Sequence, residues 1–100
     1  MVDQWECVAE LVPWDAAQAA WVFAALPEKV SDEIDAAVPF KGGFGSVKVD
    51  VLIGASRWRT SVFPDSSRGC YVLPVKKAIR KAEGIELGDR VTVNLSLVVD

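Results

Sequence analysis

The sequence contains no histidine, and only two of its 100 residues are cysteines. Histidine is the usual base for activating a serine or cysteine nucleophile. Histidine and cysteine are also the usual zinc ligands, but Cys7 and Cys70 lie far apart and form no CxxC pair. We therefore expect no metal site, no cofactor and no enzymatic activity, and we interpret both cysteines as small buried apolar residues.

Long apolar runs are missing as well. The longest apolar stretch, Ala19–Leu26, has eight residues, whereas a membrane-spanning helix needs about 20. The first residues, MVDQWEC, are acidic and lack the basic and apolar segments of a signal peptide. These features predict a cytoplasmic protein that does not bind a membrane.

The composition is that of a packed globular protein. Hydrophobic residues make up 51% of the chain and include four tryptophans, which argues against disorder. One hundred residues is a common size for one domain and suffices for a core without metals or disulfides. We expect a single domain over residues 1–100.

Alternation of apolar and polar residues predicts six strands. In the clearest example, Val47, Val49 and Val51 alternate with Lys48 and Asp50. By the same criterion, Arg57, Arg59 and Ser61 share one face of a strand, opposite Trp58, Thr60 and Val62. The expected strands are Trp5–Leu11, Ala19–Leu26, Ser46–Ile53, Arg57–Phe63, Cys70–Leu73 and Arg90–Val99.

Two short helices are expected to begin at Pro27 and Pro74, because proline suits the first helical turn. Apolar residues then recur at helical spacing, and Pro39 and Gly84 end the two helices. A shorter first helix capped by Ser31 is an alternative. The predicted apolar faces are Val30, Ile34, Ala37 and Val38 in the first helix, and Val75, Ala78, Ile79 and Ala82 in the second.

The two helices belong to an internal repeat with halves at about 5–53 and 57–99. In each half a strand ends in Leu-Pro, and a helix, a glycine turn and an alternating strand follow. One such unit is too small to bury its own sheet face. We therefore predict a mainly β fold, a small closed β-barrel of two pseudo-repeats with two short capping helices, because closure removes exposed strand edges.

The second unit, LPVKKAIRKAEGIELGDRV, resembles the swapped-hairpin transcription factors and antitoxins of the AbrB/MazE type. The matching positions are Arg80, Gly84-Ile85 and Gly88-Asp89. Glu83 departs from the pattern, because those proteins usually carry leucine there. The resemblance implies a related barrel, which AbrB-type proteins build from two chains.

A longer resemblance covers nearly the whole chain. Its pieces are Trp21 to Pro27, GGFG from Gly42, VKVDVLIG from Val47, WRTSVFP from Trp58, and LPVKKAIRKAEGI followed by GD. Together they are similar to the bacterial and archaeal family called domain of unknown function 1905. The resemblance implies a helix-capped double-split barrel without an established activity. Because one chain would hold both halves, we expect a monomer.

The charges are unevenly distributed. Residues 1–40 carry eight acidic and one basic residue, whereas residues 41–81 carry nine basic and two acidic residues. The asymmetry is either a binding footprint or an attraction between two parts of one fold. Nucleic-acid binding by a basic face of the second helix is one hypothesis, but the first helix, its counterpart, is acidic. That basic face comprises Lys76, Lys77, Arg80 and Lys81.

A second hypothesis places a small anionic ligand near the WRTS segment. Trp58 offers an aromatic face, and Arg57, Arg59 and Ser61 offer hydrogen-bond donors, with Arg80 as a further candidate. Alternatively, Trp58 is a core residue and Arg59 is solvated or forms a structural ion pair, for example with an acid of the first helix. We favour a non-catalytic binding module for a small anionic ligand or a protein partner, with nucleic acid as the alternative.

Overall fold

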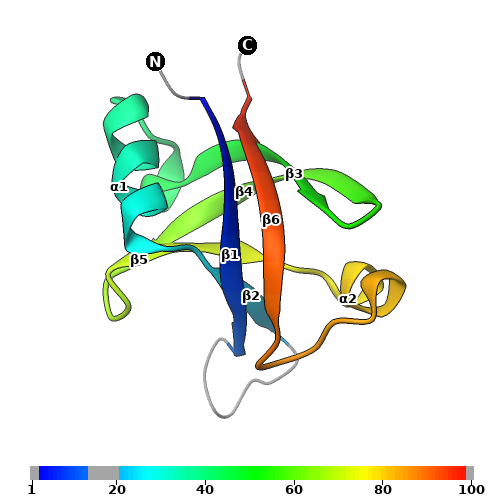
Figure 1. Cartoon of the computed structure of the whole chain (residues 1–100). Helices are drawn as coiled ribbons and strands as arrows, with labels where there is room; N and C mark the ends of the chain where they lie inside the picture. Colours follow the sequence, from blue (N-terminus) through cyan, green and yellow to red (C-terminus); the bar gives the residue numbers. More distant parts are fainter. Residues whose placement is uncertain (1–2, 14–20, 99–100) are drawn as a thin grey trace.

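The computed structural model describes residues 3–13 and 21–98, which form a closed barrel of six antiparallel strands with two α-helices (Figure 1). The strand order is β1-β2-β5-β4-β3-β6, and β6 pairs back with β1. The predicted mainly β closed barrel is confirmed. The elements are β1 (Gln4–Pro13), β2 (Val22–Ala25), α1 (Glu28–Ala37), a 3-10 turn η1 (Gly43–Gly45), β3 (Val47–Ile53), β4 (Ser56–Asp65), β5 (Cys70–Pro74), α2 (Lys77–Glu83) and β6 (Arg90–Leu97).

The strand pairing has a twofold pattern. Exchanging β1, β2 and β3 with β4, β5 and β6 leaves the order of strands in the barrel unchanged. β1 pairs with β6 from Gln4 to Glu10, and β3 pairs with β4 over its whole length from Val47 to Ile53. Two equivalent strand–strand–helix–strand units would pair in this way.

The barrel interior holds the residues that alternation placed on the inner face of each strand. Val49, Val51 and Val93 are at most 1% exposed, and Trp58 packs against the same core from β4. Ile34 is the fully buried contact from α1, and Val30, Ala37 and Val38 pack beside the core as predicted. Burial of these side chains contributes most of the stability of a fold of this size.

The two short strands leave gaps in the barrel wall. β1 pairs with β2 only from Glu10 to Pro13, and β4 pairs with β5 only from Phe63 to Asp65. The helix α1 follows β2 and lies beside the part of β1 that β2 does not reach. In the same way, α2 follows β5 and lies beside the part of β4 that β5 does not reach. Trp5 Nε1 in β1 donates to Glu33 Oε1 of α1 at 3.1 Å. Similarly, Ser56 Oγ in β4 donates to Glu83 Oε2 of α2 at 2.6 Å.

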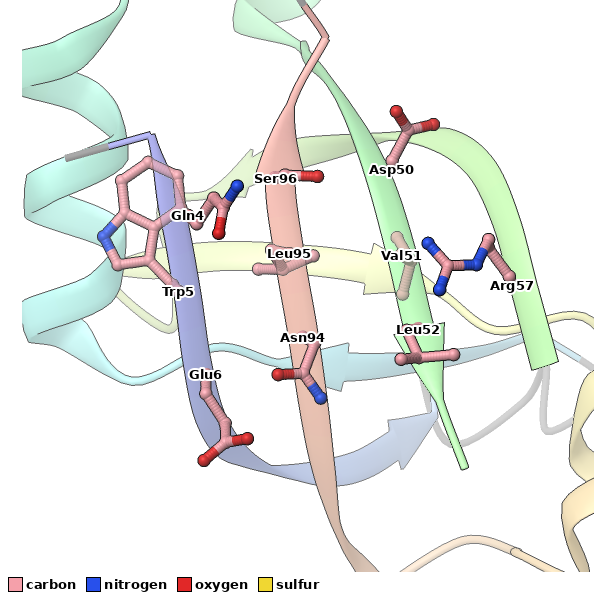
Figure 2. A pocket seen from close by; sticks show the side chains of 10 residues that line it. All are labelled: Gln4, Trp5, Glu6, Asp50, Val51, Leu52, Arg57, Asn94, Leu95 and Ser96. Atoms are coloured by element: carbon pink, nitrogen blue, oxygen red, sulfur yellow. The ribbon is translucent and has the colours of Figure 1, made fainter. Parts of the chain in front are cut away.

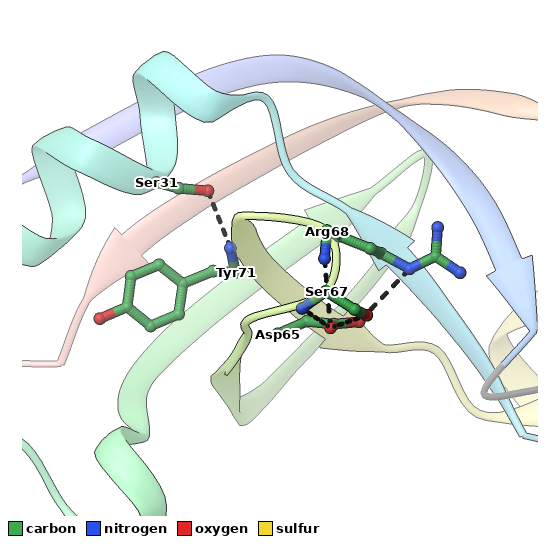
Figure 3. Close-up of polar contacts among 5 residues, drawn as sticks. All are labelled: Ser31, Asp65, Ser67, Arg68 and Tyr71. Atoms are coloured by element: carbon green, nitrogen blue, oxygen red, sulfur yellow. Dashed lines mark hydrogen bonds and ion pairs between the residues drawn. The ribbon is translucent and has the colours of Figure 1, made fainter.

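Ser31 lies within α1, so it is not the N-cap of the helix, and its side chain connects α1 to β5. Pro27 occupies the N-cap position with an extended backbone, so neither predicted helix start is right. Leu26 N–H still donates to the Tyr71 carbonyl at 3.0 Å, but proline has no N–H to continue such pairing. The buried Tyr71 N–H donates instead to Ser31 Oγ at 2.9 Å (Figure 3). The side chain therefore completes the hydrogen bonding where β2 ends.

The second helix begins later than predicted. Pro74 remains in β5, and Val75 N–H donates to the Val22 carbonyl at 3.0 Å, so the chain stays extended until α2 starts at Lys77. Ala78 and Ala82 are consequently exposed rather than part of an apolar face. Gly84 does end the helix in the left-handed region, with φ 63°.

Several strand ends also differ from the prediction. β1 reaches Pro13, and β4 extends at both ends, from Ser56 to Asp65. The predicted start of the second strand at Ala19 and the predicted end of the last at Val99 lie outside the described residues.

We expect Ser31→Ala to reduce the free energy of unfolding by about 1–3 kcal/mol, because the buried Tyr71 N–H would lose its acceptor, Ser31 Oγ. Asp32→Ala, at the exposed neighbouring position of α1, is the matched control and should change the stability much less. Urea denaturation of both variants measures the difference. Equal effects of the two substitutions would contradict the assigned role of Ser31.

Candidate functional site

The outward side chains of four adjacent strands form rows across β1, β6, β3 and β4. The strand register places Glu6 opposite Asn94, Asn94 opposite Leu52, and Leu52 opposite Arg57. The next row runs through Gln4, Ser96, Asp50 and Arg59. Residues from both ends and the middle of the chain therefore share one surface.

This surface contains a hollow of about 460 Å³, which we call the outer-face hollow (Figure 2). Its polar side chains come from all four strands, and Leu52 supplies an apolar contact near its middle. The hollow is lined by Gln4, Trp5, Glu6, Asp50, Val51, Leu52, Arg57, Asn94, Leu95 and Ser96.

Arg59 is engaged by a neighbour on this face. Its Nε lies 2.8 Å from Asp50 Oδ1, and its second terminal nitrogen lies 3.2 Å from Asp50 Oδ2. The hydrogen bond from Arg59 is the main reason that the pKa of Asp50 is lowered, and the charges of Arg59 and Arg57 add to the effect. Arg59 thus forms a structural ion pair, but its partner belongs to β3 and not to the first helix.

Arg57 differs from Arg59 in having no such partner. Its side chain is exposed, and Figure 2 shows the guanidinium extending from β4 over β3 beside the hollow. Within residues 3–13 and 21–98, the side chains of Arg57, Asn94 and Ser96 form no hydrogen bond or ion pair. One guanidinium on this face is therefore neutralised, and the next is available to a ligand.

The remaining predicted ligand-binding residues lie elsewhere. Trp58 points into the barrel, where its buried Nε1 has no hydrogen-bond partner among the described residues. Ser61 lies on the outer face of β4 but lines a different hollow with Lys48. Arg80 is on α2, where its Nε donates to the Val75 carbonyl at 3.2 Å. The structure brings together only Arg57 and Arg59 of the predicted set.

Five polar residues of the outer-face hollow were not predicted as site residues, and one of them is Asp50 of β3. Gln4, Glu6, Asn94 and Ser96 occupy outward positions of β1 and β6. Alternation assigns such residues to a strand's outer face, but it does not show which strands are neighbours. The pairing of the first strand with the last was the missing information.

The basic face of α2 is largely exposed. Lys76 is the N-cap residue, Lys77 and Lys81 lie in the helix, and all three are exposed, whereas Arg80 is half-buried. Within the described parts of the chain, none of the three lysines forms an ion pair.

The ion pairs between described residues are local. Lys41 pairs with Asp35 at 3.0 Å, and the other two pairs are Arg59–Asp50 and Arg68–Asp65. Of these three pairs, only Lys41–Asp35 joins the acidic segment 1–40 to the basic segment 41–81, and its two residues are six positions apart in the sequence. These three ion pairs therefore do not join distant parts of the described fold.

The two cysteines are free and half-buried in different clusters. Cys7 packs against the main core, and Cys70 packs beside a smaller cluster that includes Phe23 and Val72. Burial raises the pKa of both thiols, with smaller contributions from nearby carboxylates. The thiols are consequently protonated at neutral pH and poorly reactive.

We expect Arg59→Gln to raise the pKa of Asp50 towards its ordinary value, and Arg57→Gln to raise it less, because Arg57 acts only through its charge. A carboxyl titration followed by NMR measures both changes. The lowered pKa stabilises the fold above the unfolded-state pKa of Asp50, and this contribution is lost as the pH falls through the folded-state pKa. The stability deficit of Arg59→Gln should therefore disappear in strong acid. A larger pKa change in Arg57→Gln would contradict the assignment of the ion pair.

Comparison with known proteins shows the family of this chain. Residues 8–95 match the model of a family described as Domain of unknown function (DUF1905). A search of curated proteins finds no match. Among the described residues there is no helix long and apolar enough to cross a membrane. The match spans most of the chain, so this protein belongs to the DUF1905 family.

Proposed function

We propose that this protein is a non-catalytic binding module that holds a small anionic ligand in the outer-face hollow, with Arg57 as its anchor. The observation that carries the proposal is the contrast between two neighbouring arginines. Arg59 is neutralised by Asp50, whereas Arg57 borders the hollow without a partner in the described residues. An arginine fork without a protein partner suits a carboxylate or phosphate group.

The other side chains of the hollow favour an anion that also carries hydrogen-bonding groups. Asn94 and Ser96 can donate to the ligand and accept from it, and Leu52 offers an apolar contact between them and Arg57. Glu6 lies at the far end of its row from Arg57. The carboxylate of Glu6 would repel a second anionic group and accept hydrogen bonds from a donor. A ligand with one anionic end and one donor end therefore fits best.

Binding without turnover is part of the proposal. The hydroxyl of Ser96 has no hydrogen bond to a base within the described residues, and activation of a serine needs one. A monomeric cytoplasmic protein is the accompanying expectation. It is supported by closure of the barrel within one chain and by two free thiols.

Nucleic-acid binding by α2 is the second candidate. It is favoured by three exposed lysines, Lys76, Lys77 and Lys81, without ion-pair partners among the described residues. The helix has only seven residues, however, and its counterpart α1 carries Glu28, Asp32, Glu33 and Asp35. A symmetric basic surface therefore cannot form from the two helices.

We expect Arg57→Gln to weaken binding of inorganic phosphate at least tenfold, because a hydrogen-bonded charge contact contributes roughly 1.5–3 kcal/mol. Lys77→Gln removes the same charge from the basic helix and is the matched control. Isothermal titration calorimetry of the wild type and both variants measures the effect, with circular dichroism to confirm folding.

The proposal requires saturable binding by the wild type and unchanged binding by Lys77→Gln. If Lys77→Gln instead weakens anion binding and Arg57→Gln does not, the anion site is on α2. A steep loss of duplex DNA binding with added salt would then support the second candidate.

A further inference from the structure

A second hollow, of about 710 Å³, lies over the outer faces of β2, β5 and β4. It shares no lining residue with the outer-face hollow. Most of its lining is aromatic or proline rings, and we call it the aromatic hollow. These rings belong to Trp21, Phe23, Phe44, Phe63, Pro64 and Pro74.

Two of these rings are largely exposed to solvent. The residue Trp21 is 62% exposed, and Phe44 is 96% exposed. By contrast, Phe23 is buried in a small cluster against which Phe63 packs. Large exposed rings gathered around one hollow are the usual mark of an interaction surface.

The segment that carries Phe44 is an ordered loop. Gly42 N–H donates to the Ser46 carbonyl at 2.9 Å, and Ser46 N–H donates to the Gly43 carbonyl at 3.2 Å. Gly45 approaches Pro64 so closely that an added Cβ would lie 3.2 Å from the proline ring. Phe44 itself has φ 59°, a conformation that residues with a side chain rarely adopt. The fold thus maintains a strained backbone to present a ring that contributes little to the core.

We propose that the aromatic hollow binds a short, uncharged, proline-rich peptide in the polyproline II conformation. Charge is the first argument. Asp65 is the only charged residue among those that line the hollow. Its carboxylate already accepts hydrogen bonds from Ser67 and pairs with Arg68 Nε at 3.3 Å (Figure 3). The hollow therefore offers no free charge to an ionic partner.

Size is the second argument. Ten residues line the hollow, whereas a stable interface between two proteins uses about 20–30 residues on each side. A second copy of the chain would need a much larger surface. A few residues of extended peptide fit the available space.

The way in which the peptide can be recognised is the third argument. β5 is paired with β2 on one side and β4 on the other, so a peptide cannot extend the sheet beneath the hollow. Recognition must use side chains. A polyproline II segment has rings that stack on aromatic walls and carbonyls without internal partners.

Donors for those carbonyls lie around the hollow. Within the described part of the chain, the Trp21 indole N–H and the Ser66 hydroxyl form no hydrogen bond. Each can donate to a proline carbonyl of the bound peptide. The hollow thus combines stacking surfaces with donors, which is the combination a proline-rich segment requires.

The test is binding of a fluorescently labelled peptide of twelve prolines, measured by anisotropy, with a twelve-residue Gly-Ser peptide as the comparison. We expect saturable binding of the proline peptide alone, and at least a tenfold loss of affinity in Phe44→Ala. Phe40→Ala is the matched control, because Phe40 is also 91% exposed but does not line the hollow. It should bind within twofold of the wild type.

Three results would overturn the inference. They are absence of saturable binding up to millimolar concentration, equal effects of the two phenylalanine substitutions, and a surface used for something else. The last result would be seen if the wild type forms dimers in sedimentation experiments or binds phosphatidylcholine vesicles. Phe44→Ala would then abolish the dimers or the vesicle binding but would still bind the proline peptide. Arg57→Gln should leave peptide binding unchanged, so this inference fails or holds separately from the proposed anion site.

Discussion

The barrel depends on how its wall is closed where the two short strands end. Pro27 follows β2 and Pro74 ends β5, and a proline cannot donate to a neighbouring strand. The helix after each short strand occupies the gap. In α1, Ser31 accepts from the Tyr71 backbone and Glu33 accepts from Trp5. In α2, Glu83 accepts from Ser56.

Because the barrel is closed, the side chains on the inner faces of the strands pack against one another and form the core. The interior is filled by side chains from all six strands of the described chain, most of them aliphatic, and by Ile34. Binding surfaces must therefore lie on the outer faces of the strands. Both hollows considered above satisfy this condition, and each draws residues from at least three strands.

Local patterns in the sequence predicted the strands well because alternation is a property of each strand by itself. The same patterns placed Arg57 and Arg59 correctly on one outer face. The start of α2 was predicted wrongly because it depends on a distant contact. Val75 pairs with Val22, and this hydrogen bond keeps the chain extended past Pro74.

The composition of the candidate site was only partly predictable, for a related reason. Glu6 and Asn94 join Arg57 through the pairing of β1 with β6 and of β6 with β3, which no local pattern reveals. Trp58 was grouped with Arg57 because the two are adjacent in sequence, and Arg80 because of its residue type, whereas the fold separates them. Phe44 was interpreted as part of a glycine turn, and its exposure beside Phe63 depends on the approach of Gly45 to Pro64.

The most direct test of the proposed anion site is a titration of the wild-type protein with inorganic phosphate, followed by amide NMR. The account predicts saturable shifts concentrated at the backbone amides of Leu52, Arg57 and Asn94, and at the side-chain amide of Asn94. Shifts confined to Lys77–Lys81, or no saturable shift at any residue, would contradict it.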